Sequence, residues 1–337
     1  MSQSLLSLTN HKHLSLFQVM NLLAQEHDNQ TVINLTRKWC LDSESEDIQR
    51  ISMEFLYMNG YYKDLQVMIH KNEKSQNPLN REWSKYYQLQ LDQRLKVRSA
   101  TEVIEVAEQM QTNSPELQCL IEFIKISAYY SLSDFAKIGN FSHDQPDLFR
   151  SIDDRLLVSY FTVRTYQNLF IYHWTRNEVI IARKYAYQIL NQIIDLKVKT
   201  SLHINMALSY TFDTYSQAMY HLSEALKLSQ DHNFHYYAHI IKNNNIPFIS
   251  AHFNETEGIT SQDKSEQAHL EIARGNYSTA IQLLEGLEQT DPFTLYYMGR
   301  AHQDEDLLQQ SYHSFVYDWG DYFYARLPLN ALRNMSY

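Results

Sequence analysis

Glycine and proline are scarce in this sequence, with seven and six copies among 337 residues. An average protein devotes about 12% of its residues to these two types together. Sheet-rich folds and loop-built active sites need glycine and proline for their turns, and few such turns are possible here. The composition therefore predicts an all-α chain of helices with short connections, and it argues against glycine-rich phosphate-binding loops.

Hydrophobic residues recur at the helical period along most of the sequence. Helices are expected over 14–25, 31–40, 46–58, 62–71, 156–174, 178–191, 198–212, 215–229, 234–251, 268–274, 277–287, 293–302 and 307–318. We expect an interruption near Pro247 and a terminal helix after Pro328. The polar stretch 252–267 has little apolar surface to bury, which predicts a linker.

Three of the expected turns are followed by an alanine early in the next helix, at Ala182, Ala218 and Ala280. Small residues there let two helices approach closely, as in tetratricopeptide repeats of about 34 residues. One repeat cannot bury its apolar face alone, so repeats stack. We therefore expect an all-α, right-handed superhelical solenoid. We expect an irregular repeat region over 1–150 and a peptide-binding region that ends in a capping helix over 151–337.

Several function classes are disfavoured by composition and motifs. A net charge of −10 disfavours a chain-wide nucleic-acid clamp. Cys40 and Cys119 form no CxxC motif and are read as reduced thiols, as in a cytoplasmic protein. No signal peptide and no membrane-spanning run is apparent. Without GxSxG or HExxH motifs, we expect no enzyme, no metal site and no cofactor, and His232, His235 and His239 are read as ordinary helix residues.

Polar residues on one face of two expected helices suggest a peptide-binding groove. Arg164 and Asn168 lie one turn apart in the first helix, and Asn205 lies in the second. Such side chains can pair with the amide groups of an extended peptide. The alternative is a solvated outer face, because inward and outward polar residues look the same in one sequence.

A series of short segments follows a family pattern in order and spacing. These segments are LSLFQVMNLLA and LTRKWCLD near the start, 59–65, Arg164, 177–178 with 182–185, 209–212, 245–248, 253–254, 296–297, 321–323 and 327–329. Through them the sequence resembles the AimR-type arbitrium receptors of temperate phages that infect Bacillus. The resemblance spans roughly residues 13–337, and no single segment is a sharp motif.

The resemblance implies a tetratricopeptide-like homodimer that forms partly through the C-terminal helix, where we name Leu327, Leu329 and Leu332. It also implies that a short signalling peptide binds in the groove. Peptide binding then changes the receptor's hold on DNA, and this sets the choice between lysis and lysogeny. On this basis the chain is expected to be a peptide pheromone receptor of the quorum-sensing type.

Family peptide contacts carry over to this sequence in part. The family's aspartate near the C-terminus falls on Asp321, and the following aromatic residue falls on Phe323. A groove arginine falls on Lys197, which keeps the charge but loses the bidentate fork. Asn245 belongs to one of the matching segments and is expected to contact the peptide as well.

Two positions depart from the family pattern. Ile171 and Leu208 stand where the family has polar groove residues. Asn168 and Asn205 lie one turn upstream on the same faces and could replace them. These departures leave the identity of the peptide open.

From the resemblance we expect the family's N-terminal helix-turn-helix module to be missing ahead of the matching segments, and we therefore do not expect DNA binding through such a module. The leading interpretation is a peptide-responsive regulator of transcription. The alternative is a scaffold or antagonist without DNA binding that dimerises with, or sequesters, a protein partner. Direct DNA binding through other residues is a third interpretation, which the acidic net charge disfavours.

Overall fold

The computed structural model describes residues 14–141, 149–287 and 291–335, and the regular structure of these residues is helical throughout. The expected all-α fold is confirmed. The helices of the first half are α2 (Leu16–Leu23), α3 (Asn29–Asp42), α4 (Glu46–Met58), α5 (Tyr62–Glu73), α6 (Pro78–Arg94), α7 (Ala100–Gln109), α8 (Pro115–Ser131) and the short η1 (Phe135–Phe141).

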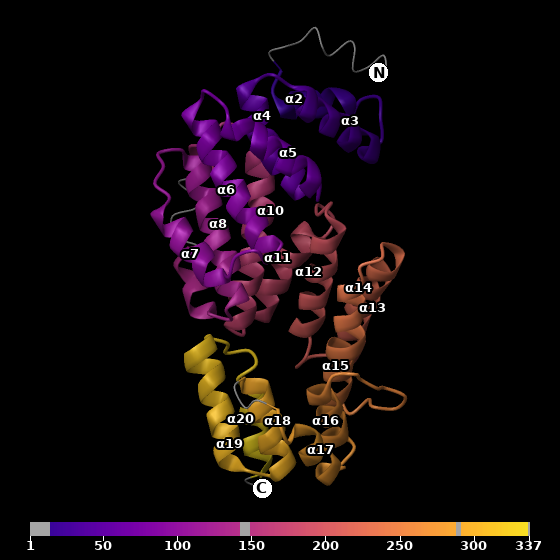
Figure 1. Ribbon diagram of the computed structural model, residues 1–337. Coiled ribbons are helices and arrows are strands. Elements are labelled where there is room, and N and C mark those ends of the chain that lie inside the picture. Colours follow the sequence, from indigo (N-terminus) through magenta and orange to yellow (C-terminus); the bar gives the residue numbers. More distant parts are fainter. Residues whose placement is uncertain (1–13, 142–148, 288–290, 336–337) are drawn as a thin grey trace. The chain divides into compact units, whose positions relative to one another are not determined.

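The second half continues in the same manner (Figure 1). Its helices are α10 (Arg155–Thr175), α11 (Val179–Ile189), α12 (Leu196–Ser209), α13 (Tyr215–Asp231), α14 (His235–Ile240), η2 (Ile241–Asn245), α15 (Ile246–His252), α16 (Lys264–Ala273), α17 (Tyr277–Leu284), α18 (Pro292–His302), α19 (Glu305–His313), η3 (Ser314–Trp319) and α20 (Arg326–Met335).

The chain divides into two compact units. Unit 1 comprises Met1–Leu132 and Asn140–Thr165, and unit 2 comprises Ser133–Gly139 and Tyr166–Tyr337. The division falls inside α10, whereas the boundary expected from the sequence lies at 150–151, shortly before this helix begins. A helix that continues through the division explains why no change in composition marks it.

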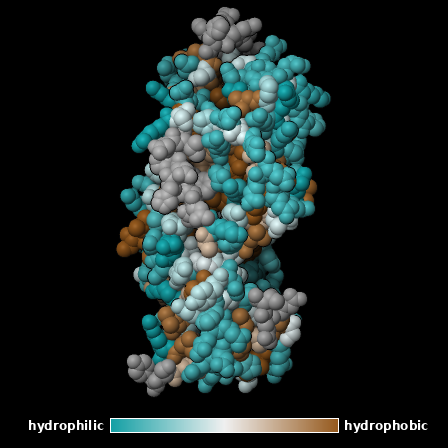
Figure 2. Space-filling model, turned by 90° about the vertical axis from the view of Figure 1, so that its left-hand side faces the viewer, coloured by the Kyte–Doolittle hydropathy of each residue, from teal (hydrophilic) through white to brown (hydrophobic). Residues whose placement is uncertain are grey.

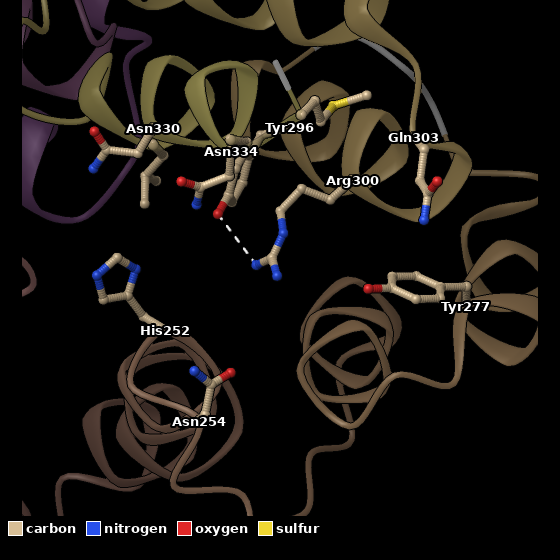
Figure 3. Close-up of a pocket in the computed structure, with 11 residues that line it drawn as sticks. His252, Asn254, Tyr277, Tyr296, Arg300, Gln303, Asn330 and Asn334 are labelled. Carbon is tan, nitrogen blue, oxygen red and sulfur yellow. Dashed lines mark hydrogen bonds between the residues drawn. The ribbon is translucent and has the colours of Figure 1, made fainter. Parts of the chain in front are cut away.

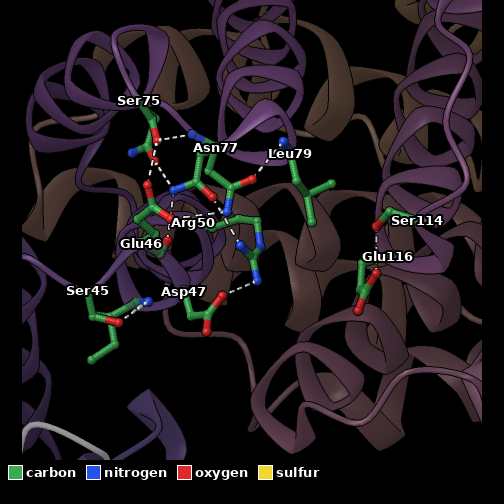
Figure 4. A network of polar contacts seen from close by, with 12 residues as sticks. Ser45, Glu46, Asp47, Arg50, Ser75, Asn77, Leu79, Ser114 and Glu116 are labelled. Atoms are coloured by element: carbon green, nitrogen blue, oxygen red, sulfur yellow. Dashed lines mark hydrogen bonds and ion pairs between the residues drawn. The ribbon is translucent and has the colours of Figure 1, made fainter.

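Most helices of unit 1 begin with a side chain that caps the first turn. Ser45 caps α4, and Glu46 and Asp47 lie in its first turn, where acidic groups complement the helix dipole. Glu46 also accepts hydrogen bonds from the Ser75 hydroxyl and the Asn77 amide, both at 3.2 Å (Figure 4). These two hydrogen bonds therefore connect the start of α4 to the residues just before α6.

Unit 2 packs consecutive helices as hairpins, among them α12 with α13, α16 with α17 and α18 with α19. The alanines singled out in the sequence, Ala182, Ala218 and Ala280, are each 0% exposed. The turns before two of these helices adopt positive φ angles, 65° at Asn177 and 80° at Gly275. Small residues therefore lie where paired helices meet.

The interruption expected near Pro247 is present, because a π-helical turn, η2, separates α14 from α15, and Pro247 lies in the first turn of α15. Two other local expectations for unit 2 need correction. The stretch 252–267 is not a linker between the units. Arg274 donates to the carbonyl oxygens of Thr256 and Ile259 at 2.9 and 2.7 Å, and α16 already begins at Lys264. Finally, α20 begins at Arg326, two residues before Pro328.

The face of the molecule in Figure 2 is mostly hydrophilic, with hydrophobic residues in small scattered groups. Within the described residues, no helix is both long enough and apolar enough to cross a lipid bilayer.

Candidate ligand-binding site

Unit 2 contains a cavity of about 620 Å³. Small-molecule and cofactor sites in proteins usually occupy about 300–1,000 Å³. The lining consists of His252, Asn254, Tyr277, Tyr296, Arg300, Gln303, Leu327, Asn330, Ala331, Asn334 and Met335. Most of these side chains are polar, and they come from the end of α15, the start of α17, α18 and α20 (Figure 3).

One side of the cavity comes from α18 and the residue that ends it. Tyr296 and Arg300 lie four residues apart on α18 and therefore on the same face. The Arg300 guanidinium donates to the Tyr296 hydroxyl at 3.3 Å. Gln303 terminates the helix in a left-handed conformation with φ of 56°. The C-terminal half of α18 and its cap thus place an aromatic ring, a cation and an amide together.

The remaining lining comes from α20, the end of α15 and the start of α17. Asn330 and Asn334 are one turn apart on α20, and both residues line the cavity (Figure 3). Asn254 follows α15 with φ of 60°, a conformation that asparagine tolerates better than most residues. Together with Gln303, these three asparagines contribute four amide side chains to the lining of the cavity.

His252 carries no positive charge in this environment at neutral pH. Burial lowers the pKa of its imidazole, and the charges of Arg300 and Arg326 lower it further, to about 4. The Arg326 guanidinium lies 4.1 Å from the centroid of the Phe212 ring, which forms a T-shaped pair with the His252 ring. The cavity therefore combines a neutral imidazole with a positively charged guanidinium.

A second buried polar group of unit 2 joins α16 and α18. The Tyr297 hydroxyl donates to Glu266 Oε1 at 3.1 Å, and the His269 ring stacks on Tyr297 with centroids 4.4 Å apart. Burial raises the pKa of Glu266 to about 8 and lowers that of His269 well below its usual value. Glu266 Oε2 and both ring nitrogens of His269 lack hydrogen-bond partners among the described residues.

The predicted peptide contact Arg164 lies inside unit 1 instead of lining a ligand site. Its side chain is 8% exposed, and its guanidinium is 3.3 Å from both carboxylate oxygens of Glu54. It also donates to the Tyr86 hydroxyl at 3.1 Å and to Gln90 at 3.2 Å. We therefore assign Arg164 to the core of unit 1, because its donors already have partners there.

The other polar residues predicted for the groove lie in unit 2 but do not line the cavity. Asn168 and Asn205 are half-buried, and Lys197 is exposed with its Nζ 5.5 Å from the centroid of the Phe234 ring. Asn245 is buried in η2. The Asn168 amide nitrogen and the Asn245 amide oxygen lack hydrogen-bond partners among the described residues. Peptide binding by these residues stays a prediction.

Asp321 and Phe323 are buried and form part of the interior of unit 2. Asp321 is 4% exposed and accepts a hydrogen bond from the Tyr324 backbone at 2.9 Å, and burial raises its pKa to about 7. Phe323 is 1% exposed and packs edge-on against Trp174 and Phe212. Neither residue offers much free surface to a ligand in this state of the chain.

The three leucines predicted for dimerisation lie on α20 as expected, but they differ in burial. Leu327 is 2% exposed and lines the cavity, so it contacts its own chain. Leu329 and Leu332 are half-buried. The cavity itself was missed at the sequence level. Its available signals were two polar pairs at helical spacing, Tyr296 with Arg300 and Asn330 with Asn334.

Comparison with known proteins gives consistent results for family and fold. A family described as AimR transcriptional regulator-like matches residues 32–334. An uncharacterised Bacillus anthracis protein, pXO2-35/BXB0035/GBAA_pXO2_0035, is 22% identical over 232 residues, which cover 66% of this chain and 86% of that protein.

Two solved structures share the fold with this chain at 16% sequence identity. A structure of phAimR-Ligand superposes with a TM-score of 0.74 and covers 96% of this chain and 98% of that one. A structure of SeMet-phAimR superposes with a TM-score of 0.67 and covers 95% and 85%, respectively.

Proposed function

Because the chain belongs to the AimR transcriptional regulator-like family, we propose that it is a peptide-responsive regulator. Its ligand is a short signalling peptide that binds in the cavity of unit 2. The observation that carries the proposal is the polar lining of this cavity, which includes amide side chains from α20 and from the residues that follow α15 and α18. The likeness to a structure of phAimR-Ligand supports it.

The lining suits a peptide better than an apolar small molecule. A peptide backbone presents alternating donors and acceptors, and asparagine side chains can satisfy both. Asn254, Asn330 and Asn334 supply such groups, and Tyr277 and Tyr296 add aromatic surface for side chains. A purely apolar ligand would leave these groups desolvated without partners, which opposes binding.

Binding can be transmitted because the cavity lies between α20 and other elements of unit 2. A ligand that contacts Asn330 and Arg300 together stabilises one position of α20 against α18. The half-buried Leu329 and Leu332 lie on the same helix, and we assign the dimer contact to them. Peptide binding then changes the dimer, and through it the transcription that decides between lysis and lysogeny.

The proposal is tested by affinity selection of a randomised library of short peptides on the purified protein. Calorimetry and thermal unfolding are then measured with the recovered peptides. A peptide present at about 100 times its dissociation constant should stabilise the fold by about 2.7 kcal/mol.

The variant Asn330→Ala/Asn334→Ala should weaken this binding, because it removes two amides from the lining. Asn191→Ala, an exposed asparagine outside the cavity, is the matched control and should bind as the wild type does. A folded protein that binds no peptide would overturn the proposal and favour a scaffold or antagonist that acts on a protein partner.

A further inference from the structure

The cavity of unit 2 has a charge balance opposite to that of the whole chain. The sequence contains 39 Asp and Glu against 29 Lys and Arg. The lining, by contrast, contains Arg300 and neither aspartate nor glutamate. A positive charge in a concave site attracts anions more strongly than one on an open surface.

The Arg300 guanidinium has N–H groups that are not used in the hydrogen bonds of the described residues. A guanidinium carries five N–H groups, and in the described part of the chain Arg300 directs one hydrogen bond to the Tyr296 hydroxyl and forms no ion pair. Its side chain is partly buried, and in Figure 3 its guanidinium lies among His252, Asn254 and Asn334. The remaining donors therefore face the space that a ligand would fill.

The surroundings do not neutralise this charge. Both Arg300 and Arg326 act on His252 as positive charges, and the imidazole stays neutral. Amides from Asn254, Gln303, Asn330 and Asn334 can donate to a ligand oxygen without adding charge. One guanidinium with neutral donors matches one carboxylate, which it can bind in a bidentate manner.

We propose that the cavity recognises a carboxylate group of the ligand, held by the Arg300 guanidinium with help from neighbouring asparagine amides. The inference rests on the proposed function and names the group that the site selects. Two parts of a peptide can supply this group, its C-terminal carboxylate or the side chain of an aspartate or glutamate.

The experiment uses two randomised short-peptide libraries, identical except that one ends in free carboxylates and the other in carboxamides. Both are selected on the full chain, and recovered peptides are measured by calorimetry. Arg300→Gln should weaken binding of the selected peptides about tenfold or more, because it removes a charge-assisted pair. The affinity of the Arg300→Lys variant should lie between those of the wild type and Arg300→Gln, because lysine keeps the charge but cannot form the bidentate contact.

Arg333→Gln is the matched control, because Arg333 is exposed on α20 and does not line the cavity. It makes the same change in net charge and should leave affinity unchanged. Thermal unfolding of each variant verifies that it is folded before affinities are compared.

The outcomes separate the two proposals. Enrichment in the free-acid library alone, with loss on amidation, supports recognition of the C-terminal carboxylate. Enrichment of acidic side chains in both libraries, with loss when Asp is replaced by Asn, supports recognition of a side chain. Equal binding of free and amidated peptides without acidic residues, unaffected by Arg300→Gln, overturns this inference and leaves the proposed function standing. No binding from either library overturns both.

Discussion

Arg164 of unit 1 and Arg300 of unit 2 show two ways in which a fold can accommodate a guanidinium. Arg164 is 7% exposed, and Glu54, the Tyr86 hydroxyl and Gln90 all accept its hydrogen bonds. Arg300 lines a cavity whose lining contains no aspartate or glutamate, and it donates one hydrogen bond to Tyr296. The donors of Arg164 are used within unit 1, whereas Arg300 keeps donors that can bind a ligand.

Two glutamates repeat the contrast. Glu54 has a side chain that is 0% exposed, with the Arg164 guanidinium and the Tyr87 hydroxyl, at 2.5 Å, as partners. Glu266 is also buried, but it has no arginine or lysine partner in the described part of the chain, and burial raises its pKa to about 8. In unit 1 a buried guanidinium pairs with the buried carboxylate, whereas in unit 2 burial without such a cation favours the neutral form of Glu266.

The largest effect is expected from Arg164→Met. The substitution leaves the Glu54 carboxylate buried without its cation, and breaking a buried ion pair typically costs about 3–5 kcal/mol. Denaturant unfolding should show this loss.

Two further variants sharpen the test of Arg164. Arg98→Met removes an exposed partner of Asp92 and should cost less than about 1 kcal/mol. Arg164→Met/Glu54→Gln should recover part of the lost stability, because it also removes the stranded charge. A small loss for Arg164→Met alone would show that unit 1 does not depend on this pair.

A pH-dependent effect is expected from Glu266→Gln. The folded chain holds the Glu266 proton up to about pH 8, whereas an unfolded glutamate loses it near its ordinary pKa of 4.5. Between these values the folded state binds more protons, so wild-type stability falls as pH rises. Glutamine does not titrate, so the stability of the variant relative to the wild type should increase by up to about 1.4 kcal/mol per pH unit as the pH rises through this window.

The matched substitution in unit 1 should behave in the opposite way. Glu54→Gln strands the Arg164 guanidinium and should lower stability near neutral pH, where Glu266→Gln gains. Urea unfolding of both variants between pH 5 and pH 8 gives the free energy of unfolding at each pH by linear extrapolation, and the two variants are then compared. If Glu266→Gln changes stability equally at every pH, the neutral state of Glu266 is contradicted.

The smallest effect is expected from Arg300→Gln without ligand. The variant removes one charge that has no counter-ion in the cavity, so the free energy of unfolding should change by less than about 0.5 kcal/mol. The pKa of His252 should rise above its value of about 4, because one of the two nearby cations is lost. An NMR titration of the His252 ring measures this change, and an unchanged pKa would contradict the proposed proximity of the two groups.

Much of the helical organisation could be predicted from sequence alone. Both ends of α4 agree with the expected 46–58, and the turns at Asn177 and Gly275 lie where they were expected. The small residue Ala218 is buried as a close helix contact requires. These features depend on periodicity, capping and turn chemistry, which act over a few neighbouring residues.

The candidate site depended on the tertiary structure. Arg164 and Arg300 both lie within helices, and their local sequences do not show which one has a buried carboxylate partner. Glu54 lies 110 positions from Arg164, and the cavity joins four segments between His252 and Met335. The sequence alone determined where the helices form, because helix formation is governed by nearby residues. Which polar side chains are satisfied and which face a cavity was decided by long-range packing, because a partner far along the chain leaves no local signal.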